Sequence, residues 1–211
     1  MGLFAPPDVE RYARVGHIDK LTEAARSKRW PEAAIAARRA LEEHMDLLID
    51  TLGTKNLRRV LTAREALKVI GRPATKALIE KLDDPRRERR QDVVHALGEV
   101  GDPYAVKALV ERLRDPDGLV RQLTCRALAK IGDPRALGPL RRAAAADPDG
   151  SVRKTAAEAA RRLEKRSQAA ASQAAAAAQE APGGGEPTDQ ADGADDEGAD
   201  DDSGDDEEES P

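Results

Sequence analysis

Three histidines and one cysteine are the side chains of this 211-residue chain best suited to nucleophilic, acid–base or metal chemistry. His17 and His44 have no partner at the spacing of a metal site or a catalytic triad. His95 occupies a position that is polar in every copy of an internal repeat, which predicts a solvated helix residue. Cys125 aligns with small apolar residues, which predicts a packed thiol. The sequence therefore predicts no catalytic residue and no metal ligand.

The sequence patterns of several enzyme classes are missing. The chain has no GxxxxGK[ST] phosphate loop, no GxGxxG fingerprint, no HExxH zinc motif and no GxSxG nucleophile elbow. A single cysteine excludes an internal disulfide and every multi-cysteine zinc or iron–sulfur site. We expect no enzymatic activity and no cofactor.

The spacing of aspartate and arginine predicts charge pairing. Three Asp-Pro turns are each followed by an arginine six residues after the aspartate, in the pairs Asp84/Arg90, Asp115/Arg121 and Asp147/Arg153. Across a turn that contains proline, this spacing lets the carboxylate accept hydrogen bonds from free amides at the helix start. The guanidinium closes on that carboxylate or on the aspartate of the neighbouring repeat. We expect these six residues to form a structural ladder.

An internal repeat supplies the elements that position these pairs. Residues 90–113 align with residues 121–144 at a shift of 31, including a Gly-Asp-Pro in each. A further copy follows at a shift of 32, and an earlier one starts at Leu57 and is one residue shorter at Arg72-Pro73. Apolar residues recur at helical spacing before and after Gly132-Asp133-Pro134, so each period predicts a helical hairpin.

At these residues the sequence resembles the HEAT-like repeats of the phycobilisome-lyase type, whose unit combines Asp-Pro, Val-Arg, a small-residue helix and Gly-Asp-Pro. The resemblance is close over residues 84–162, recognisable from residue 57 and degenerate back to about residue 17. Residues 4–10 resemble the lead-in of small bacterial HEAT proteins. The resemblance implies an all-α fold, an α-solenoid of about five HEAT-like helical hairpins.

Enzymes with this architecture need residues that the chain lacks. Deoxyhypusine hydroxylase binds two irons through His-Glu pairs six residues before the leucine of a Leu-Gly signature. The matching positions here are Leu61-Thr62, Gln91-Asp92, Gln122-Leu123 and Lys154-Thr155, and only Asp92 could ligate a hard cation. Aromatic residues make up 2% of the chain, too few for the tetrapyrrole pocket of a bilin lyase or the groove of an alkylpurine DNA glycosylase.

The chain divides into five predicted segments. These are an N-terminal lead-in (1–16), degenerate capping repeats (17–56), HEAT-like repeats (57–166), an Ala-rich helical extension or linker (167–182) and a disordered acidic tail (183–211). Within the cap, Trp30-Pro31 is expected to start a helix that runs toward Leu52, with Trp30 as a packing anchor.

Charge is divided sharply along the chain. Residues 1–166 hold all 35 Lys and Arg but 25 of the 40 Asp and Glu, a net charge of 35 − 25 = +10, and residues 167–211 hold the other 15 acidic residues. A like-charged block without large apolar side chains cannot offset its chain entropy, which predicts disorder over residues 183–211.

A basic surface is the remaining candidate site. In the family that the chain resembles, the second helix of each hairpin lines the concave face. The predicted partner-binding residues there are Lys76, Lys81, Lys107, Arg112, Arg114 and Arg142, interleaved with a few acids. We expect a non-catalytic protein-binding or scaffold module for an acidic protein partner, modulated by the tail. The alternatives are a nucleic-acid-binding HEAT module, disfavoured because stacking aromatics are few, and an accessory protein related to bilin lyases.

Hydropathy argues against a membrane location. Mean hydropathy is −0.65, 36% of residues are charged, and no stretch approaches eighteen consecutive apolar residues. Residues 1–15 lack the apolar core of a signal peptide. We expect a monomeric cytoplasmic protein that has no membrane partner.

Overall fold

The computed structural model describes residues 5–180, with side chains to residue 174. Over these residues all regular structure is helical, as predicted. The α-helices are α1 (Val9–Val15), α2 (Ile18–Ala25), α3 (Pro31–Glu43), α4 (Met45–Thr51), α5 (Leu57–Ile70), α6 (Arg72–Glu80), α7 (Arg87–Val100), α8 (Val106–Arg112), α9 (Gly118–Ile131), α10 (Leu137–Ala146) and α11 (Gly150–Glu180). Two 3₁₀ turns, η1 (Pro103–Ala105) and η2 (Pro134–Ala136), lead into α8 and α10.

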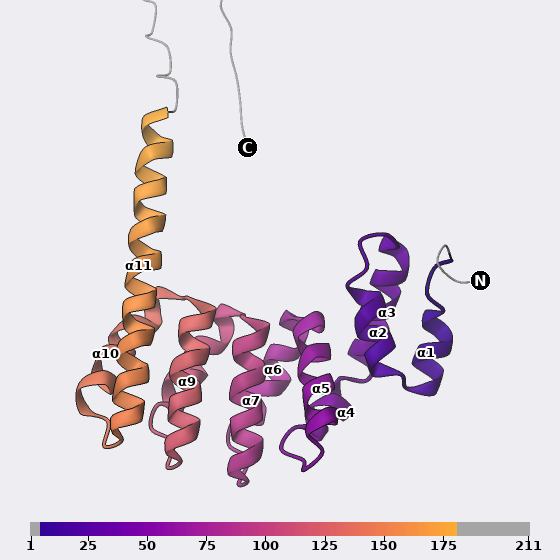
Figure 1. The fold of residues 1–211 in the computed structure, drawn as a ribbon, viewed down its shortest axis with the longest axis horizontal. Coiled ribbons are helices and arrows are strands. Elements are labelled where there is room, and N and C mark those ends of the chain that lie inside the picture. The colour runs from indigo at the N-terminus through magenta and orange to yellow at the C-terminus, as the bar shows by residue number, and fades with distance from the viewer. Residues whose placement is uncertain (1–4, 181–211) are drawn as a thin grey trace, which may run out of the picture.

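The helices form an α-solenoid of two rows (Figure 1). The first row consists of α2, α5, α7, α9 and α11, each packed against the next. The second row consists of α3 with α4, then α6, α8 and α10, each of which follows its first-row helix in the chain. This stack of helical hairpins confirms the predicted solenoid. The predicted acidic tail, residues 183–211, lies outside the described residues.

Aspartate caps and left-handed glycines set the ends of the hairpin helices. The side chain of Asp117 caps α9 by accepting a hydrogen bond from the backbone amide three residues on. The helix ends at Gly132, whose φ of 80° is favourable only for glycine, and Asp133 then caps η2. Gly101-Asp102 ends α7 and starts η1 in the same way. The Gly-Asp-Pro motif therefore reverses the chain in the α7–α8 and α9–α10 hairpins.

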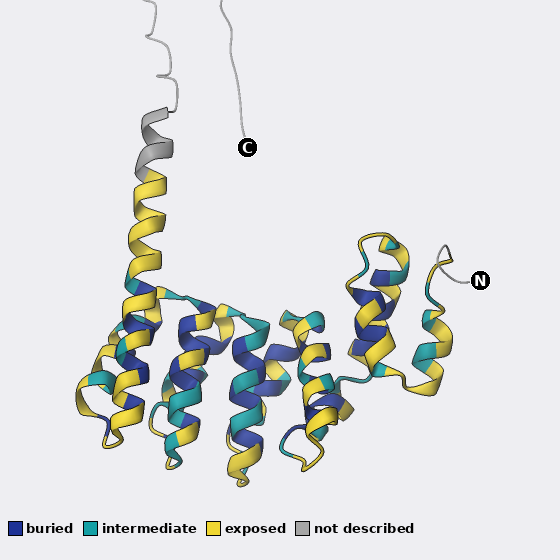
Figure 2. Ribbon diagram, viewed as in Figure 1, coloured by how far each residue is buried: buried dark blue, intermediate teal, exposed yellow. Residues whose placement is uncertain are grey.

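Leucines at the repeat period build the core between the two rows. The fully buried large side chains include Leu67, Leu97 and Leu128 in the first row and Leu78, Leu109 and Leu140 in the second. Figure 2 shows the buried faces turned toward neighbouring helices along the stack. Each hairpin thus contributes one leucine from each row, and its apolar face is covered only when the next hairpin is stacked on it.

The N-terminal unit differs from the sequence-based expectation in two places. Residues 1–16, predicted as a lead-in, contain α1, which is capped by Asp8 and ends at the left-handed Gly16. The helix expected to continue toward Leu52 is interrupted at His44, where the backbone leaves the helical range. The break redirects the chain so that α4 packs against α5 and α6, where the buried Leu52 follows it.

The last helix extends past the stack (Figures 1 and 2). Leu163 is the last buried residue of α11 among those whose side chains are described, and residues 165–174 are exposed. The segment predicted as an Ala-rich helical extension lies in α11 as far as Glu180. Within residues 5–180 no helix combines the length and the apolar character needed to cross a membrane.

Neighbouring first-row helices approach most tightly where a glycine faces an alanine. A Cβ atom placed on Gly98 of α7 would lie 2.9 Å from the Cβ of Ala127 in α9 and 3.0 Å from its Cα. Both distances are shorter than van der Waals contact, and Gly98 is buried. Glycine at this position therefore sets the separation of α7 and α9.

We predict that Gly98→Ala lowers the free energy of unfolding by about 1–3 kcal/mol, because overpacking outweighs the gain of up to about 1 kcal/mol in helix propensity. Gly138→Ala in α10 is the matched control, since its nearest heavy atom is the Arg142 guanidinium at 3.6 Å. The control should be neutral or stabilising in urea denaturation. Equal responses in the two variants would contradict the close contact.

Candidate functional site

Each ladder arginine connects the turns of two successive repeats. Nη1 of Arg90 donates to the carbonyl oxygens of Asp84 and Pro85 in its own turn, at 2.9 and 3.2 Å. Nε and Nη2 of the same side chain donate to the two carboxylate oxygens of Asp115 in the next repeat, at 2.8 and 3.0 Å. The carboxyl of Asp115 is completely buried. One guanidinium therefore joins a turn to the turn that follows it.

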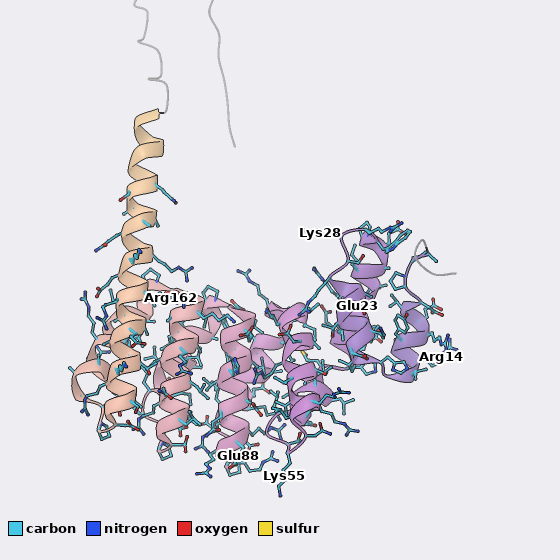
Figure 3. The ribbon with its side chains drawn as sticks, viewed as in Figure 1. Arg14, Glu23, Lys28, Lys55, Glu88 and Arg162 are labelled. Atoms are coloured by element: carbon cyan, nitrogen blue, oxygen red, sulfur yellow. The ribbon has the colours of Figure 1, made fainter. Side chains whose placement is uncertain are left out.

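The next rung of the ladder, meaning the next pair of an arginine with the aspartate of the following repeat, has the same geometry. Arg121 donates through Nη1 to the carbonyl oxygen of Asp115 at 2.9 Å, and through Nε and Nη2 to the carboxylate of Asp147 at 2.8 and 3.0 Å. Each carboxylate also accepts from the backbone amide two residues later, at 2.9 Å in both turns. The ladder lies at the edge where the first-row helices begin, marked by Glu88 in Figure 3.

The ladder changes partners at Asp84. Its carboxylate accepts from the amide and guanidinium of Arg86, and lies 3.5 Å from Nε of Arg89. The buried Arg89 side chain also donates to the carbonyl oxygen of Ile49 at 3.2 Å and to the Asp50 carboxylate at 2.6 Å. Asp84 therefore belongs to a junction that ties α7 to the capping unit.

Electrostatics keep the central rung ionised. Burial by itself raises the pKa of the Asp147 carboxyl, but hydrogen bonds from Arg121 and from the Asp149 amide outweigh burial and hold this pKa below its usual value. The hydrogen bond to Asp147 in turn raises the pKa of Arg121. The pair is thus a charged structural link.

A second column of charges crosses the first-row helices. Glu99 of α7 pairs with Lys68 of α5, at 3.2 Å, and with Lys130 of α9. The hydrogen bond from Lys130 is the largest influence, and together with Lys68 it overcomes burial and lowers the pKa of Glu99 to about 2. The three residues are separated by the 31-residue period and alternate in charge, so this column could have been found from the sequence.

His95 lies beside this column and is more enclosed than predicted, with 39% of its side chain exposed. The ring is half-buried, with Nε2 3.6 Å from Glu99 and 3.5 Å from the Arg64 guanidinium. Burial and then the charge of Arg64 lower the pKa of His95, which favours the neutral ring. Packing of α5 against α7 encloses a position that looks exposed in the repeat alignment.

Asp92, the only carboxylate at the positions compared with iron ligands, is used in a structural contact. Its Oδ2 accepts from the Gly53 amide at 2.8 Å, and its Oδ1 lies 3.7 Å from the Arg64 guanidinium. Among the residues that the structure describes, no group of three or more His, Cys, Asp or Glu side chains is arranged to hold a metal ion.

The glutamines at the corresponding positions also link neighbouring helices. Gln91 donates to the Asp117 carboxylate, and Gln122 donates to the Thr155 hydroxyl, each at 3.1 Å. Cys125 is fully buried, as predicted, and burial raises the pKa of its thiol to about 12. A thiol with this pKa stays protonated at neutral pH.

Two of the predicted binding residues meet in a groove between α8 and α10. The groove has a volume of about 560 Å³. Arg114, which follows α8, and Arg142 of α10 line it, and both side chains are exposed. Glu111 lies beside them and makes no ion pair within the part of the chain that the structure describes. The rest of the lining is Val110, Leu113, Asp115, Arg121, Pro139, Ala143, Ala146, Asp147 and Pro148. The sequence pattern missed these apolar walls, which only the packing of α8 and α10 defines.

The other four predicted binding residues do not line this groove. Arg112 pairs with Asp83 at 2.7 Å and donates to the Leu82 carbonyl at 3.4 Å, so it links α8 to the turn after α6. Lys76 and Lys107 are exposed, and Lys81 is half-buried. The structure therefore brings together Arg114 and Arg142 and leaves the rest dispersed along the second row.

Comparison with known families fits this geometry. Residues 75–161, from α6 to the first turns of α11, match the family of HEAT repeats. With the two-row fold, this match defines the class of protein as an α-solenoid whose central residues 75–161 resemble HEAT repeats. Comparison with curated proteins finds no match to the chain.

Three solved structures are similar to the chain. The chain is similar to human deoxyhypusine hydroxylase in complex with glycerol, with 28% identity, a TM-score of 0.54 and coverage of 63% of this chain and 47% of that chain. It therefore spans about half the length of the hydroxylase structure. An engineered protein matches at 19% identity, TM-score 0.42, covering 74% of this chain and 83% of its own. A designed armadillo repeat protein in complex with the peptide (KR)4 matches at 17% identity, TM-score 0.42, covering 76% and 87% respectively.

We predict that Asp115→Ala and Arg121→Ala each lower the free energy of unfolding by about 1–3 kcal/mol, because each leaves a buried charged partner unsatisfied. Arg135→Ala is the control, since this side chain pairs with Asp133 while 67% exposed. Its loss should cost less than about 0.5 kcal/mol in the same urea titration. Ladder losses as small as the control would mean that the rungs do not stabilise the stack.

The depressed pKa of Glu99 predicts an acid-dependent stability. Its contribution is complete above pH 4.5, the usual value for this carboxyl, and is lost as pH falls toward about 2. Glu99→Gln should lower the unfolding free energy at pH 7 and converge with the wild type near pH 2. Glu158→Gln, an exposed position on α11, should leave the pH profile unchanged. Parallel wild-type and Glu99→Gln profiles over this range would contradict the assignment.

Proposed function

We propose that this chain is a non-catalytic protein-interaction module whose α8–α10 groove binds an acidic segment of a partner protein. The observation that carries the proposal is the pair Arg114 and Arg142, exposed on the two sides of a groove that is lined by apolar residues and by the paired charges of the ladder. Neither side chain makes an ion pair with any residue in the described part of the chain. An acidic segment with apolar residues between its carboxylates is complementary to this lining.

The ladder residues beneath the groove also support binding of an acidic segment. Arg121, Asp115 and Asp147 also line it, but their charges are already satisfied by one another and by Arg90. Only Glu111 opposes the two free guanidinium groups. The groove therefore has a net positive charge available to a ligand, on a floor held rigid by paired side chains.

The roles of Asp92, Gln91 and Gln122 support a non-catalytic module. The similarity to deoxyhypusine hydroxylase raises an enzymatic alternative, yet these side chains are used in contacts between helices at the positions compared with iron ligands. The repeats keep the Asp-Pro and Gly-Asp-Pro pattern of the phycobilisome-lyase type. In this proposal the pattern serves stacking, and the acidic tail modulates access to the basic surface.

The test is binding of the full chain to a fluorescein-labelled peptide of alternating glutamate and leucine, measured by anisotropy at low and physiological salt. Arg114→Glu with Arg142→Glu should weaken binding by at least about tenfold, equivalent to about 1.4 kcal/mol. Arg14→Glu with Arg38→Glu, on α1 and α3, makes the same change in net charge at exposed positions away from the groove and should have little effect.

Equal losses in the two double variants would show attraction to net charge alone and overturn the groove. A labelled single-stranded oligonucleotide that binds more tightly than the peptide, and is lost in the same groove variant, would favour the nucleic-acid alternative. Among the residues that line the groove none is aromatic, so base stacking has no platform there.

A further inference from the structure

The last ladder arginine is held in the same pose as the two before it. Nη1 of Arg153 donates to the carbonyl oxygens of Asp147 and Pro148, at 2.7 and 3.1 Å, as Arg90 and Arg121 do in their own turns. Its Nη2 lies 3.5 Å from the position of a Cβ on Gly150, the first residue of α11. In the preceding repeat, Nη2 of Arg121 lies 3.7 Å from the same position on Gly118.

The opposite edge of this guanidinium has no partner among residues 5–180. In the two preceding rungs, Nε and Nη2 hold a carboxylate of the next repeat in a bidentate contact. No hairpin follows α11 within the described residues, and Nε and Nη2 of Arg153 make no hydrogen bond or ion pair there. The Arg153 residue is exposed, whereas the side chains of Arg90 and Arg121 are 10% and 11% exposed. The Nε–Nη2 edge of Arg153 is thus held in the orientation that binds a carboxylate in the two preceding repeats, and no described residue occupies it.

We propose that the Nε–Nη2 edge of Arg153 is a carboxylate-binding site and that an aspartate or glutamate of residues 200–209 of this chain fills it. The contact would add one rung to the ladder, with the geometry of Arg90–Asp115 and Arg121–Asp147. Arg153 does not line the α8–α10 groove, so this site is separate from the proposed partner site.

Charge on α11 favours this occupant. The exposed charged residues of α11 around Arg153 are basic with one exception, the set being Arg153, Lys154, Glu158, Arg161, Arg162 and Lys165. The C-terminal segment contributes eight acids between residues 200 and 209 and no basic residue. Chain and helix therefore carry opposite charges, and their attachment holds them at an effective concentration on the order of millimolar.

The C-terminal segment is long enough to reach the Nε–Nη2 edge of Arg153. Glu180 lies 27 residues from Arg153 along α11, or about 40 Å at 1.5 Å per residue. A random coil with as many residues as separate Glu180 from Glu209 has a root-mean-square span of about 30 Å and a maximum of about 95 Å. The distance from Glu180 to Arg153 is therefore within the range that a chain of this length can span.

The test uses the Nε–Hε resonances of the arginine side chains in the full chain, recorded by nuclear magnetic resonance at low salt. Neutralising the eight acids of residues 200–209 to Asn and Gln should shift the Arg153 resonance and speed exchange of its Hε with water. The resonances of Arg90 and Arg121 are internal controls that should not move, because their carboxylates lie in the stack. Arg153→Lys assigns the signal.

An Arg153 resonance that is identical in wild type and neutralised chain would overturn the proposal. A difference that grows with protein concentration would also overturn it, since the carboxylate would then come from a second copy. Loss of the difference in about 0.5 M salt, independent of protein concentration, is the result expected for an ionic contact within one chain.

Discussion

The bidentate contact between an arginine of one repeat and an aspartate of the next is the interaction on which this stack depends. A single hairpin buries one side of its leucine pair and leaves the other side to be covered by the neighbouring hairpin. This apolar contact alone fixes neither the register nor the orientation of one hairpin relative to the next. The guanidinium supplies both, because its Nη1 donates to its own turn while its Nε and Nη2 donate to the carboxylate of the next turn, which must lie at a fixed position to receive both hydrogen bonds. Desolvation of two charges limits the net stabilisation of such a pair, so its main effect is specificity of alignment.

Two kinds of charged contact, the ladder and the Lys68–Glu99–Lys130 column, lie on different parts of the first-row surface. The ladder follows the edge where the first-row helices start, and the column Lys68, Glu99 and Lys130 crosses the faces of these helices. In both the ladder and this column, most of the charged side chains are paired with a side chain of opposite charge. The second row keeps fewer cross-repeat pairs, Arg112 with Asp83 being one, and it is there that Arg114 and Arg142 remain available beside a groove. Structural pairing on one side thus determines where unpaired charge is left for a ligand.

The repeat period and the Gly-Asp-Pro punctuation were enough to predict the hairpins, because capping and left-handed glycine are local properties of the chain. The partner of each ladder arginine was not decided by the sequence. Arg90 is six residues from Asp84 and 25 from Asp115, and only stacking selects the second carboxylate. The groove was missed for the same reason, since its walls come from two helices 30 residues apart. The break at His44 depends on where α4 packs, which no local signal records.

The projecting part of α11 has a consequence for how the chain responds to temperature. Its last described contact with the stack is the hydrogen bond from Arg166 to the Lys130 carbonyl at 3.5 Å, and residues 167–174 are exposed. From Arg166 to Glu180 it spans about 21 Å as a helix, and an isolated helix of this length lies close to its helix–coil midpoint, even when rich in alanine. Warming would convert this projection from a stiff spacer into a coil, and each residue released lengthens the maximum contour by about 1.8 Å. The distance between the folded body and everything attached beyond it is therefore set by a local melting equilibrium, independent of the unfolding of the stack itself.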